Sequence, residues 1–154
     1  MKMVIQRVSR ASVRVEGAVV ASIGPGLVVL VAIERGDARA LADAAAEKLA
    51  TLRIFPESGS AKMSLSVTEV GGEILVVSQF TLAGSLRKGR RPSFDAAAPP
   101  EIAAPLCEAL STALRARSLR VNEGVFGAMM EVEIVNDGPV TFWMQSTSSG
   151  EFGP

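Results

Sequence analysis

The sequence predicts one α+β domain, built around a mainly antiparallel β-sheet with two long helices. Valine-rich, strand-like runs follow one another near both ends of the chain, and two segments carry apolar residues at helical spacing. The 154 residues are 48% hydrophobic and contain no internal repeat or linker. A chain of this size buries about 70% of its unfolded surface. We therefore expect one domain over residues 1–145, followed by a polar, glycine-rich tail over 146–154 that is flexible.

The first third of the chain predicts three strands. Residues 3–16 alternate and are rich in valine, and the turn Glu16–Gly17 leads into a second strand that ends at residue 24. Residues 26–34, "GLVVLVAIE", form a continuous apolar run. Such a run is typical of a strand that is buried on both faces.

Two helices are predicted, over about 38–52 and about 101–116. Asp37 is a plausible N-cap for the first helix, and Pro105 should bend the second helix or delay its start. Each helix has one apolar face, made of Leu41, Ala45, Leu49 and Leu52 in the first and of Ile102, Leu106, Leu110 and Leu114 in the second.

Between the helices, the turn signal Gly71–Gly72 introduces a strand over 73–82, "EILVVSQFTL". Residues 83–100 contain Gly, Pro, Ser and a basic cluster, and predict a long loop. Loops of this length in compact domains are usually functional or disordered. Three more strand-like runs follow the second helix, over 119–124, 128–135 and 139–145.

The composition excludes several kinds of chemistry. The chain has no histidine and no tyrosine, and its one cysteine is Cys107. A Ser-His-Asp triad, a Cys-His pair, a His-ligated metal and a thiolate zinc site are therefore impossible within one chain. Carboxylate sites for hard cations remain possible. We expect no cofactor and no metal, with proton transfers that depend on Lys, Asp, Glu, backbone, water or the substrate.

Charge and hydropathy indicate the compartment. Lys plus Arg and Asp plus Glu both number 16, so net charge gives no sign of nucleic acid or membrane. The longest apolar run, residues 26–33, is far shorter than the roughly 20 residues that span a bilayer. An arginine follows the N-terminus too early for a signal peptide. A lone cysteine fits a reducing compartment, so we expect a cytoplasmic protein with no membrane partner.

Two segments around the long loop could form a site. Ser78, Gln79, Phe80 and Thr81 lie where a buried strand opens into the loop, so their hydroxyls and free amides could line a pocket and stabilise an oxyanion. The alternative is an ordinary strand end whose hydroxyls bond local backbone. Arg87 and Arg90 belong to a basic cluster on the loop that suits phosphate. The alternative there is a solvated loop that contributes only solubility.

Two later segments also allow two interpretations. Phe126, Met129 and Met130 lie beside small residues and could stack on an aromatic base. The alternative is core packing, with methionine as a gap filler. The segment 136–141, "NDGPVT", contains standard turn residues and by itself indicates a hairpin turn. A cis bond before Pro139 has a base rate of only about 5%.

Taken together, these motifs resemble the D-aminoacyl-tRNA deacylase family. "SQFTL" is followed some 55 residues later by "NDGPVT", and matching segments include "QRVSRASV", "IGPGLVVLV", "LRIFP", "KMSLSV", "RRPSF" and "VNDGPVTFWMQ". The resemblance runs from Met1 to about Gln145. A related animal family replaces both the Gly-Pro pair and the Ser-Gln-Phe-Thr segment, and this chain does not follow it. Val125 departs from the basic residue that many relatives carry.

The resemblance implies a barrel-like α+β fold and a homodimer with active sites at the subunit interface. It implies hydrolysis of the ester between a D-amino acid and the 3′ end of tRNA. Since a filter that only excludes L side chains cannot reject glycine, we also expect some removal of glycine from Gly-tRNA. Ser78, Gln79, Phe80 and Thr81 would line the pocket, and Phe126 and Met130 would lie near the terminal adenosine. Gly138–Pro139 would be a Gly-cisPro motif that reaches into the partner's pocket and rejects L-amino acids.

Two mechanisms and two alternative functions remain to be separated. With no histidine, the 2′-hydroxyl of the substrate ribose could assist while the protein positions the ester and stabilises the oxyanion. Thr81 as a nucleophile is the competing idea, although no base for its proton is visible. The functional alternatives are an RNA-binding module without chemistry and a structural homo-oligomer with an incidental basic loop.

Overall fold

The computed structural model describes residues 1–87, 89–146 and 151–153. Its main sheet contains seven strands, in the order β7-β6-β3-β1-β8-β9, with β2 paired to β1. The elements are β1 (Lys2–Val15), β2 (Ala18–Ile23), β3 (Gly26–Ala32), α1 (Arg39–Thr51), β4 (Arg53–Pro56), β5 (Met63–Ser66), β6 (Glu73–Ser78), the short helix η1 (Phe80–Ala83), α2 (Pro100–Arg115), β7 (Arg120–Glu123), β8 (Glu131–Ser146) and β9 (Phe152–Gly153). This confirms the α+β class and the single domain.

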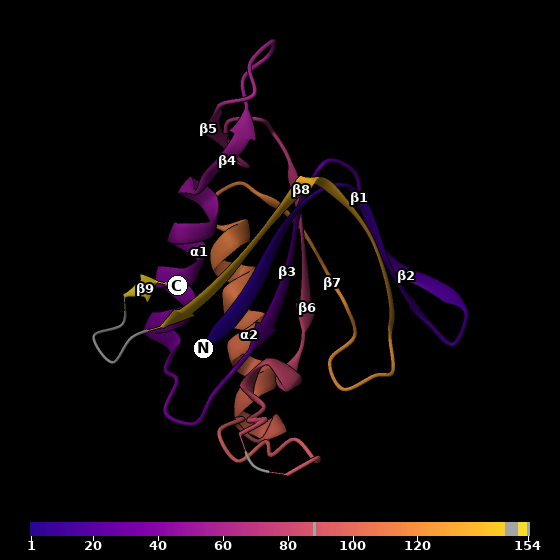
Figure 1. The fold of residues 1–154 in the computed structure, drawn as a ribbon, viewed down its shortest axis with the longest axis vertical. Helices are drawn as coiled ribbons and strands as arrows, with labels where there is room; N and C mark the ends of the chain where they lie inside the picture. Colours follow the sequence, from indigo (N-terminus) through magenta and orange to yellow (C-terminus); the bar gives the residue numbers. More distant parts are fainter. Residues whose placement is uncertain (88, 147–150, 154) are drawn as a thin grey trace.

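The sheet is mixed. β1 pairs antiparallel with β2, β3 and β8, and β8 pairs antiparallel with β9. The pairings β3–β6 and β6–β7 are parallel, which the hydrophobic pattern of the sequence did not indicate. Parallel neighbours need a crossover connection, and α1 and α2 lie in the connections that provide it. The strands β4 and β5 form a separate hairpin at one end of the molecule, which was also not predicted (Figure 1).

Two apolar clusters occupy the two faces of the sheet. The larger joins α1 and α2 to β1, β3 and β6, through residues such as Ile5, Val29, Leu49 and Leu110. The two helices lie side by side against this face (Figure 1). The smaller cluster, which includes Val8, Val13, Val28 and Leu75, lies on the other face. β3 contributes to both clusters, which confirms that this strand is buried on both faces.

Both predicted helices are present, but their details differ from expectation. Asp37 is not the N-cap of α1; Ala38 takes that position without a side-chain hydrogen bond. Asp37 instead accepts hydrogen bonds from the Met1 amino group at 2.7 Å and from the Glu34 amide at 2.7 Å. A hydrogen bond between this carboxylate and a buried, charged amino group is stronger than one to the backbone amide of an exposed helix end.

Pro105 lies inside α2 and does not delay its start, because the helix already begins at Pro100. Leu110 and Leu114 are fully buried as expected, whereas Ile102 is 48% exposed. Ala103 and Cys107 complete the buried face in its place. The buried face of α2 is therefore shifted slightly around the helix axis from the face that the spacing of the apolar residues predicted.

The hairpin interpretation of 136–141 is wrong. The predicted strands 128–135 and 139–145 are one strand, β8, which starts at Glu131 and continues through the Gly-Pro pair. Gln6 pairs with Thr141 and Val8 pairs with Asn136, so Asp137–Val140 bulges from the ladder opposite Arg7. A proline, which has no N–H to give to a ladder, is tolerated within a sheet at such a bulge.

Two further boundaries differ. The strand predicted to reach residue 82 ends at Ser78, and the chain turns into η1. In the tail, residues 147–150 and 154 lie outside the described residues, and Phe152–Gly153 pairs with Gln145–Ser146. The flexibility of the tail stays a prediction. No helix in the described ranges combines the length and the apolar character that crossing a membrane requires.

Candidate active site

The main cavity has a volume of about 620 Å³ and lies where the parallel strands β3 and β6 end. Ser78, Gln79, Phe80 and Thr81 form one wall. Residues 126–130 and Val132 form another, and the start of α2 contributes the third. Seven of the side chains that the sequence singled out as site candidates therefore meet in one cavity: Ser78, Gln79, Phe80, Thr81, Phe126, Met129 and Met130.

The wall from β6 is shaped by the way that the strand ends. Ser78 is the last residue paired to β3, opposite Val31, and the Gln79 amide donates to the Val31 carbonyl at 2.7 Å. The chain then turns, with the Leu82 amide bonded to the Gln79 carbonyl at 3.1 Å. Within the described part of the chain, the amides of Phe80 and Thr81 donate to no carbonyl or side chain. These two N–H groups are available to a ligand.

The hydroxyl of Thr81 already has a partner. The Gln79 side-chain amide Nε2 donates a hydrogen bond to Thr81 Oγ1. The hydroxyl oxygen thus accepts, and its own hydrogen remains free to donate. Among the described residues, no carboxylate or amine bonds to this hydroxyl to take its proton. The geometry favours Thr81 as a hydrogen-bond donor over Thr81 as a nucleophile.

The wall formed by residues 126–130 is apolar and open. Phe126 is 41% exposed and Met129 is 92% exposed. Met130 is half-buried and packs against the smaller apolar cluster. The packing interpretation therefore holds for Met130 and fails for Phe126 and Met129. An exposed aromatic ring beside a methionine offers a surface on which a planar base could stack.

The wall from α2 is made of small side chains. Ala97 and Ala98, just before the helix, and Ala103 and Cys107 within it all line this side of the cavity. Burial raises the pKa of the Cys107 thiol to about 11, and the nearby Glu123 carboxylate acts in the same direction. The thiol is therefore protonated at neutral pH and is a poor nucleophile.

The basic loop lies beside the cavity and does not line it. Arg87 and Arg90 are exposed, and neither forms an ion pair with any described residue. Lys88, in the same cluster, lies outside the described residues. Paired backbone bonds between Ser85 and Ser93, at 2.7 and 3.0 Å, close the base of the loop. The two arginines are thus free cations on an anchored loop.

Gly138 and Pro139 lie apart from this cavity, exposed at the bulge of β8, and the peptide bond between them is cis. Asn136 Nδ2 donates to the Arg7 carbonyl at 2.9 Å and to the Val140 carbonyl at 3.0 Å. The bulge is therefore held at both ends by one side chain.

Arg7 is the residue that sequence reasoning missed. Its Nη1 donates to the Ile54 carbonyl at 2.6 Å, and its Nε lies 3.0 Å from Asp137 Oδ2 in an ion pair, although Nε makes no hydrogen bond. Arg7 is only 8% exposed. The alternation of β1 could have revealed it, because Met3, Ile5 and Arg7 occupy equivalent positions and the first two are fully buried.

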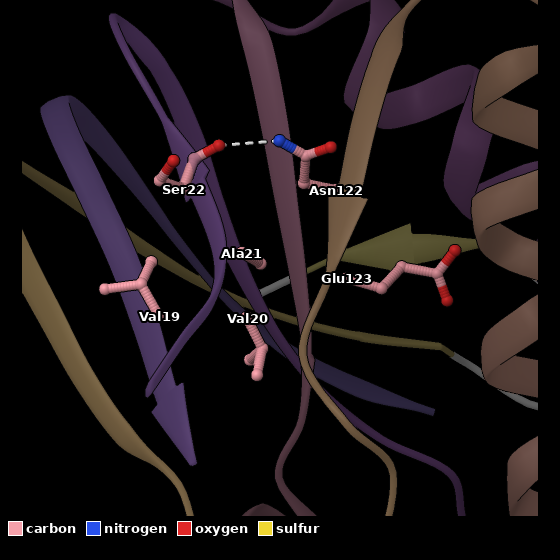
Figure 2. A pocket seen from close by; sticks show the side chains of 6 residues that line it. All are labelled: Val19, Val20, Ala21, Ser22, Asn122 and Glu123. Atoms are coloured by element: carbon pink, nitrogen blue, oxygen red, sulfur yellow. Dashed lines mark hydrogen bonds between the residues drawn. The ribbon is translucent and has the colours of Figure 1, made fainter. Parts of the chain in front are cut away.

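A second hollow, between β2 and β7, has a volume of about 320 Å³ (Figure 2). Asn122 Nδ2 donates to the Ser22 carbonyl at 2.6 Å across it. Glu123, its one ionisable residue, is paired with Arg115. With no free charged group and no convergent donors among its described lining residues, this groove is a weaker candidate than the main cavity. No group of three metal-ligating side chains occurs among the described residues.

Known proteins resemble the chain over nearly its whole length. A family model described as "D-Tyr-tRNA(Tyr) deacylase" matches residues 4–145. A protein of Anaeromyxobacter dehalogenans is 57% identical over 95% of this chain and 97% of its own length. One of Thermomicrobium roseum is 54% identical over 95% of this chain and 94% of its own length. Both are named D-aminoacyl-tRNA deacylase.

Two solved structures share the fold. One, named "c-Myc DNA Unwinding Element Binding Protein", has a TM-score of 0.90 at 40% identity and covers 96% of this chain and 100% of its own. The other, described as a probable eukaryotic D-amino acid tRNA deacylase, has a TM-score of 0.79 at 21% identity. It covers 92% of this chain and 97% of its own, and at that identity it supports the fold alone.

Proposed function

The chain belongs to the D-Tyr-tRNA(Tyr) deacylase family, and from this premise we propose that it hydrolyses the ester between a D-amino acid and the 3′ end of tRNA. It is a hydrolase of ester bonds, and its products are the free D-amino acid and tRNA. The observation that carries the proposal is the cavity lined both by Phe80 and Thr81, whose backbone amides have no partner within the described chain, and by the exposed ring of Phe126.

The free amides of Phe80 and Thr81 stabilise the negative charge that develops on the ester carbonyl oxygen. When water attacks the ester carbonyl, negative charge develops on its oxygen, and N–H groups fixed in a cavity stabilise that charge. The Thr81 hydroxyl, which accepts from Gln79, has a hydrogen left to donate. The 2′-hydroxyl of the ribose assists the attack, so the protein needs neither histidine nor a metal. The aminoacyl ester is already labile, which lowers the demand on the enzyme.

The cavity wall at Phe126 and Met130, in which the ring of Phe126 is exposed and Met130 is half-buried, binds the terminal adenosine. An aromatic ring stacks on a nucleobase without regard to sequence, at about 1–3 kcal/mol per base. This fits a substrate whose 3′ end is common to all tRNAs. Val125, which is 43% exposed, adds no charge here.

Arg87 and Arg90 bind tRNA phosphates beside the cavity. Both guanidinium groups are exposed and unpaired within the described chain, on a loop that is closed by Ser85 and Ser93. Arginine forks match phosphate oxygens, and contacts of this kind do not depend on the base sequence.

Selection against L-amino acids requires a second copy of the chain. Gly138–Pro139 does not line the cavity of its own subunit, but it is exposed on a bulge that Arg7 and Asn136 hold in place. We place it in the cavity of the partner subunit of a homodimer. Large apolar side chains exposed near it on β8, Phe142 at 41% and Trp143 at 45%, would be covered in such an assembly.

The selection works by exclusion. Exchanging D for L swaps the hydrogen and the side chain on Cα, so a rigid backbone at that point collides with every L side chain. It collides with no D side chain, whatever its size. Such a backbone excludes L-amino acids by collision and makes no specific contact with D side chains. Glycine is not excluded, because it has no side chain in either position.

A nucleic-acid-binding module without chemistry is the alternative, and it has a specific basis because the 40% identical structure is named as a DNA-binding protein. One experiment separates the two. D-Tyr-tRNA and L-Tyr-tRNA are mixed with purified protein, with and without a chelator, and ester loss is followed over time. We expect loss of the D ester alone, equal in both buffers. Binding without ester loss would support the alternative, and loss only without chelator would contradict the metal-free mechanism.

A further inference from the structure

An aromatic pair joins the basic loop to the cavity. The rings of Phe80 and Phe94 meet edge to face, with centroids 5.0 Å apart and planes at 62°. Phe80 belongs to the cavity wall, and Phe94 follows directly after Ser93, which closes the loop. We propose that Phe94 is a positioning residue, which holds the Phe80–Thr81 turn so that its amides meet the ester carbonyl. The inference rests on the proposed function and adds a residue to it.

The turn that carries these amides is tied to β3 at its start, where the Gln79 amide donates to the Val31 carbonyl at 2.7 Å, and the Gln79 side chain bonds to Thr81 Oγ1. Two more backbone bonds, from Leu82 to Gln79 at 3.1 Å and from Gly84 to Thr81 at 3.0 Å, close the turn from its C-terminal side. At its start, the amides of Phe80 and Thr81 are unbonded within the described part of the chain, and the Phe80 side chain is 58% exposed. The ring of Phe94 supports the Phe80 side chain directly, at the residue whose own amide makes no bond.

Phe94 itself is firmly placed. Its carbonyl accepts from the Ala97 amide at 2.9 Å, and the Ala98 amide bonds to the Ile33 carbonyl at the end of β3, also at 2.9 Å. On the other side, the Ser85–Ser93 bonds fix the loop residue that precedes it. The ring of Phe94 thus contacts Phe80 from a backbone that is bonded on both sides.

Gly84 lets the ring come this close. A Cβ at position 84 would lie 2.9 Å from Cε1 of Phe94 and 2.9 Å from the Thr81 carbonyl oxygen. Any side chain there would push the ring and the turn apart. Gly84→Ala therefore perturbs the same contact from a different residue, without removing either ring.

The size of the effect follows from the contact. Edge-to-face pairs contribute beyond their buried area by an amount equivalent to about 2–10-fold in a rate. A small displacement of reacting groups can cost more. We expect Phe94→Ala to lower the single-turnover rate constant on D-Tyr-tRNA about 5–20-fold, with the Kd for tRNA changed less than about twofold. Phe94→Tyr keeps the ring and should restore most of the rate.

The test compares Phe94→Ala, Phe94→Tyr and Gly84→Ala with Leu86→Ala, a control in the same loop whose side chain is 79% exposed. Each protein is assayed on D-Tyr-tRNA and on D-tyrosyl-adenosine, which lacks the body of tRNA. A positioning role lowers the rate on both substrates. A rate loss confined to the full tRNA, a loss of affinity alone, or an unchanged rate would overturn the inference.

A structural measurement keeps the inference separate from the proposed reaction. Backbone NMR relaxation should show lower order parameters at Phe80 and Thr81 in Phe94→Ala than in Leu86→Ala. Unchanged order parameters would overturn the positioning role even if the protein had no deacylase activity. Conversely, an inactive wild-type protein whose Phe80 loosens in Phe94→Ala would refute the proposed function and leave the contact's role intact.

Discussion

Replacing Gly138 by alanine tests whether the bulge of β8 must keep its shape. Gly138 has φ of +126°, a conformation that L residues rarely adopt. A Cβ there would lie 2.7 Å from Cγ2 of Val140 and 3.1 Å from Nη2 of Arg7. The substitution therefore strains the backbone and also pushes against the two residues that border the bulge.

The two costs can be separated with Gly17→Ala. Gly17 also has positive φ, at +80°, but an added Cβ would meet nothing within 4 Å. The conformational cost alone is about 1–2 kcal/mol, and forcing an extra methyl into an occupied space adds about 1–3 kcal/mol. Gly138→Ala should thus lower the free energy of unfolding by about 2–5 kcal/mol, and Gly17→Ala by about 1–2 kcal/mol.

Urea unfolding of both variants measures these values, and deacylation is assayed where both remain folded. We expect Gly17→Ala to hydrolyse D-Tyr-tRNA like the wild type. Gly138→Ala should lose roughly tenfold or more in kcat/KM, because its displaced wall no longer fits the partner's cavity. Equal stability of the two variants would refute the packing argument. Unchanged kcat/KM in Gly138→Ala would refute the role of the bulge.

Three other predictions concern the loop, the thiol and the N-terminus. Replacing both Arg87 and Arg90 by alanine should weaken binding of every tRNA alike and reduce the log–log salt slope by up to about 0.9 for each lost phosphate contact. Cys107 should resist alkylation at about pH 8 until the protein unfolds. Because burial raises its pKa from the ordinary value of 9.0 to about 11, its contribution to stability should be full below pH 9 and lost as the pH rises toward 11. Asp37→Ala should destabilise the fold by about 1.5–3 kcal/mol, since it removes one hydrogen-bonded partner of the buried Met1 amino group and leaves Glu34 at 3.3 Å and Ser146 at 2.8 Å.

Controls and contrary outcomes are available for each. Arg39→Ala combined with Lys48→Ala removes the same charge from exposed positions on α1. An equal reduction of the salt slope in this control would contradict specific phosphate contacts by the loop, because it would show that only the total positive charge matters. Alkylation of native Cys107 as fast as a free thiol would contradict the burial of this thiol in the folded protein. Asp43→Ala removes an exposed carboxylate of α1, and a melting curve that matches that of Asp37→Ala would refute the buried ion pair.

The cavity wall at 78–81 could be predicted because its signal is local. An apolar strand that ends in polar residues before a long loop places hydroxyls and amides at a sheet edge. What joins that wall to Phe126 and to α2 is not local. The parallel pairing of β3 with β6, and of β6 with β7, brings these segments together, and single-sequence periodicity does not specify which strands pair.

Two wrong predictions show how tertiary contacts override local preference. "NDGPVT" contains residues that favour turns, but a bulge within a long strand needs the same residues. The segment forms a bulge and not a hairpin turn because β1 pairs with β8 on both sides of it. Asp37 has a good N-cap side chain, but it bonds the amino group of a residue that is distant in sequence. Arg7 was overlooked for a related reason, because an arginine in a strand is usually exposed.

The proposed function depends above all on selection by exclusion, in which one rigid wall decides which aminoacyl-tRNA esters are hydrolysed. A single experiment probes this selection: ester loss is followed from D-Tyr-tRNA, Gly-tRNA and L-Ala-tRNA at the same enzyme concentrations. We predict that the D-tyrosyl and glycyl esters are cleaved while the L-alanyl ester survives. Gly-tRNA left intact at concentrations that clear D-Tyr-tRNA would contradict exclusion, because a wall that only collides with L side chains cannot reject glycine.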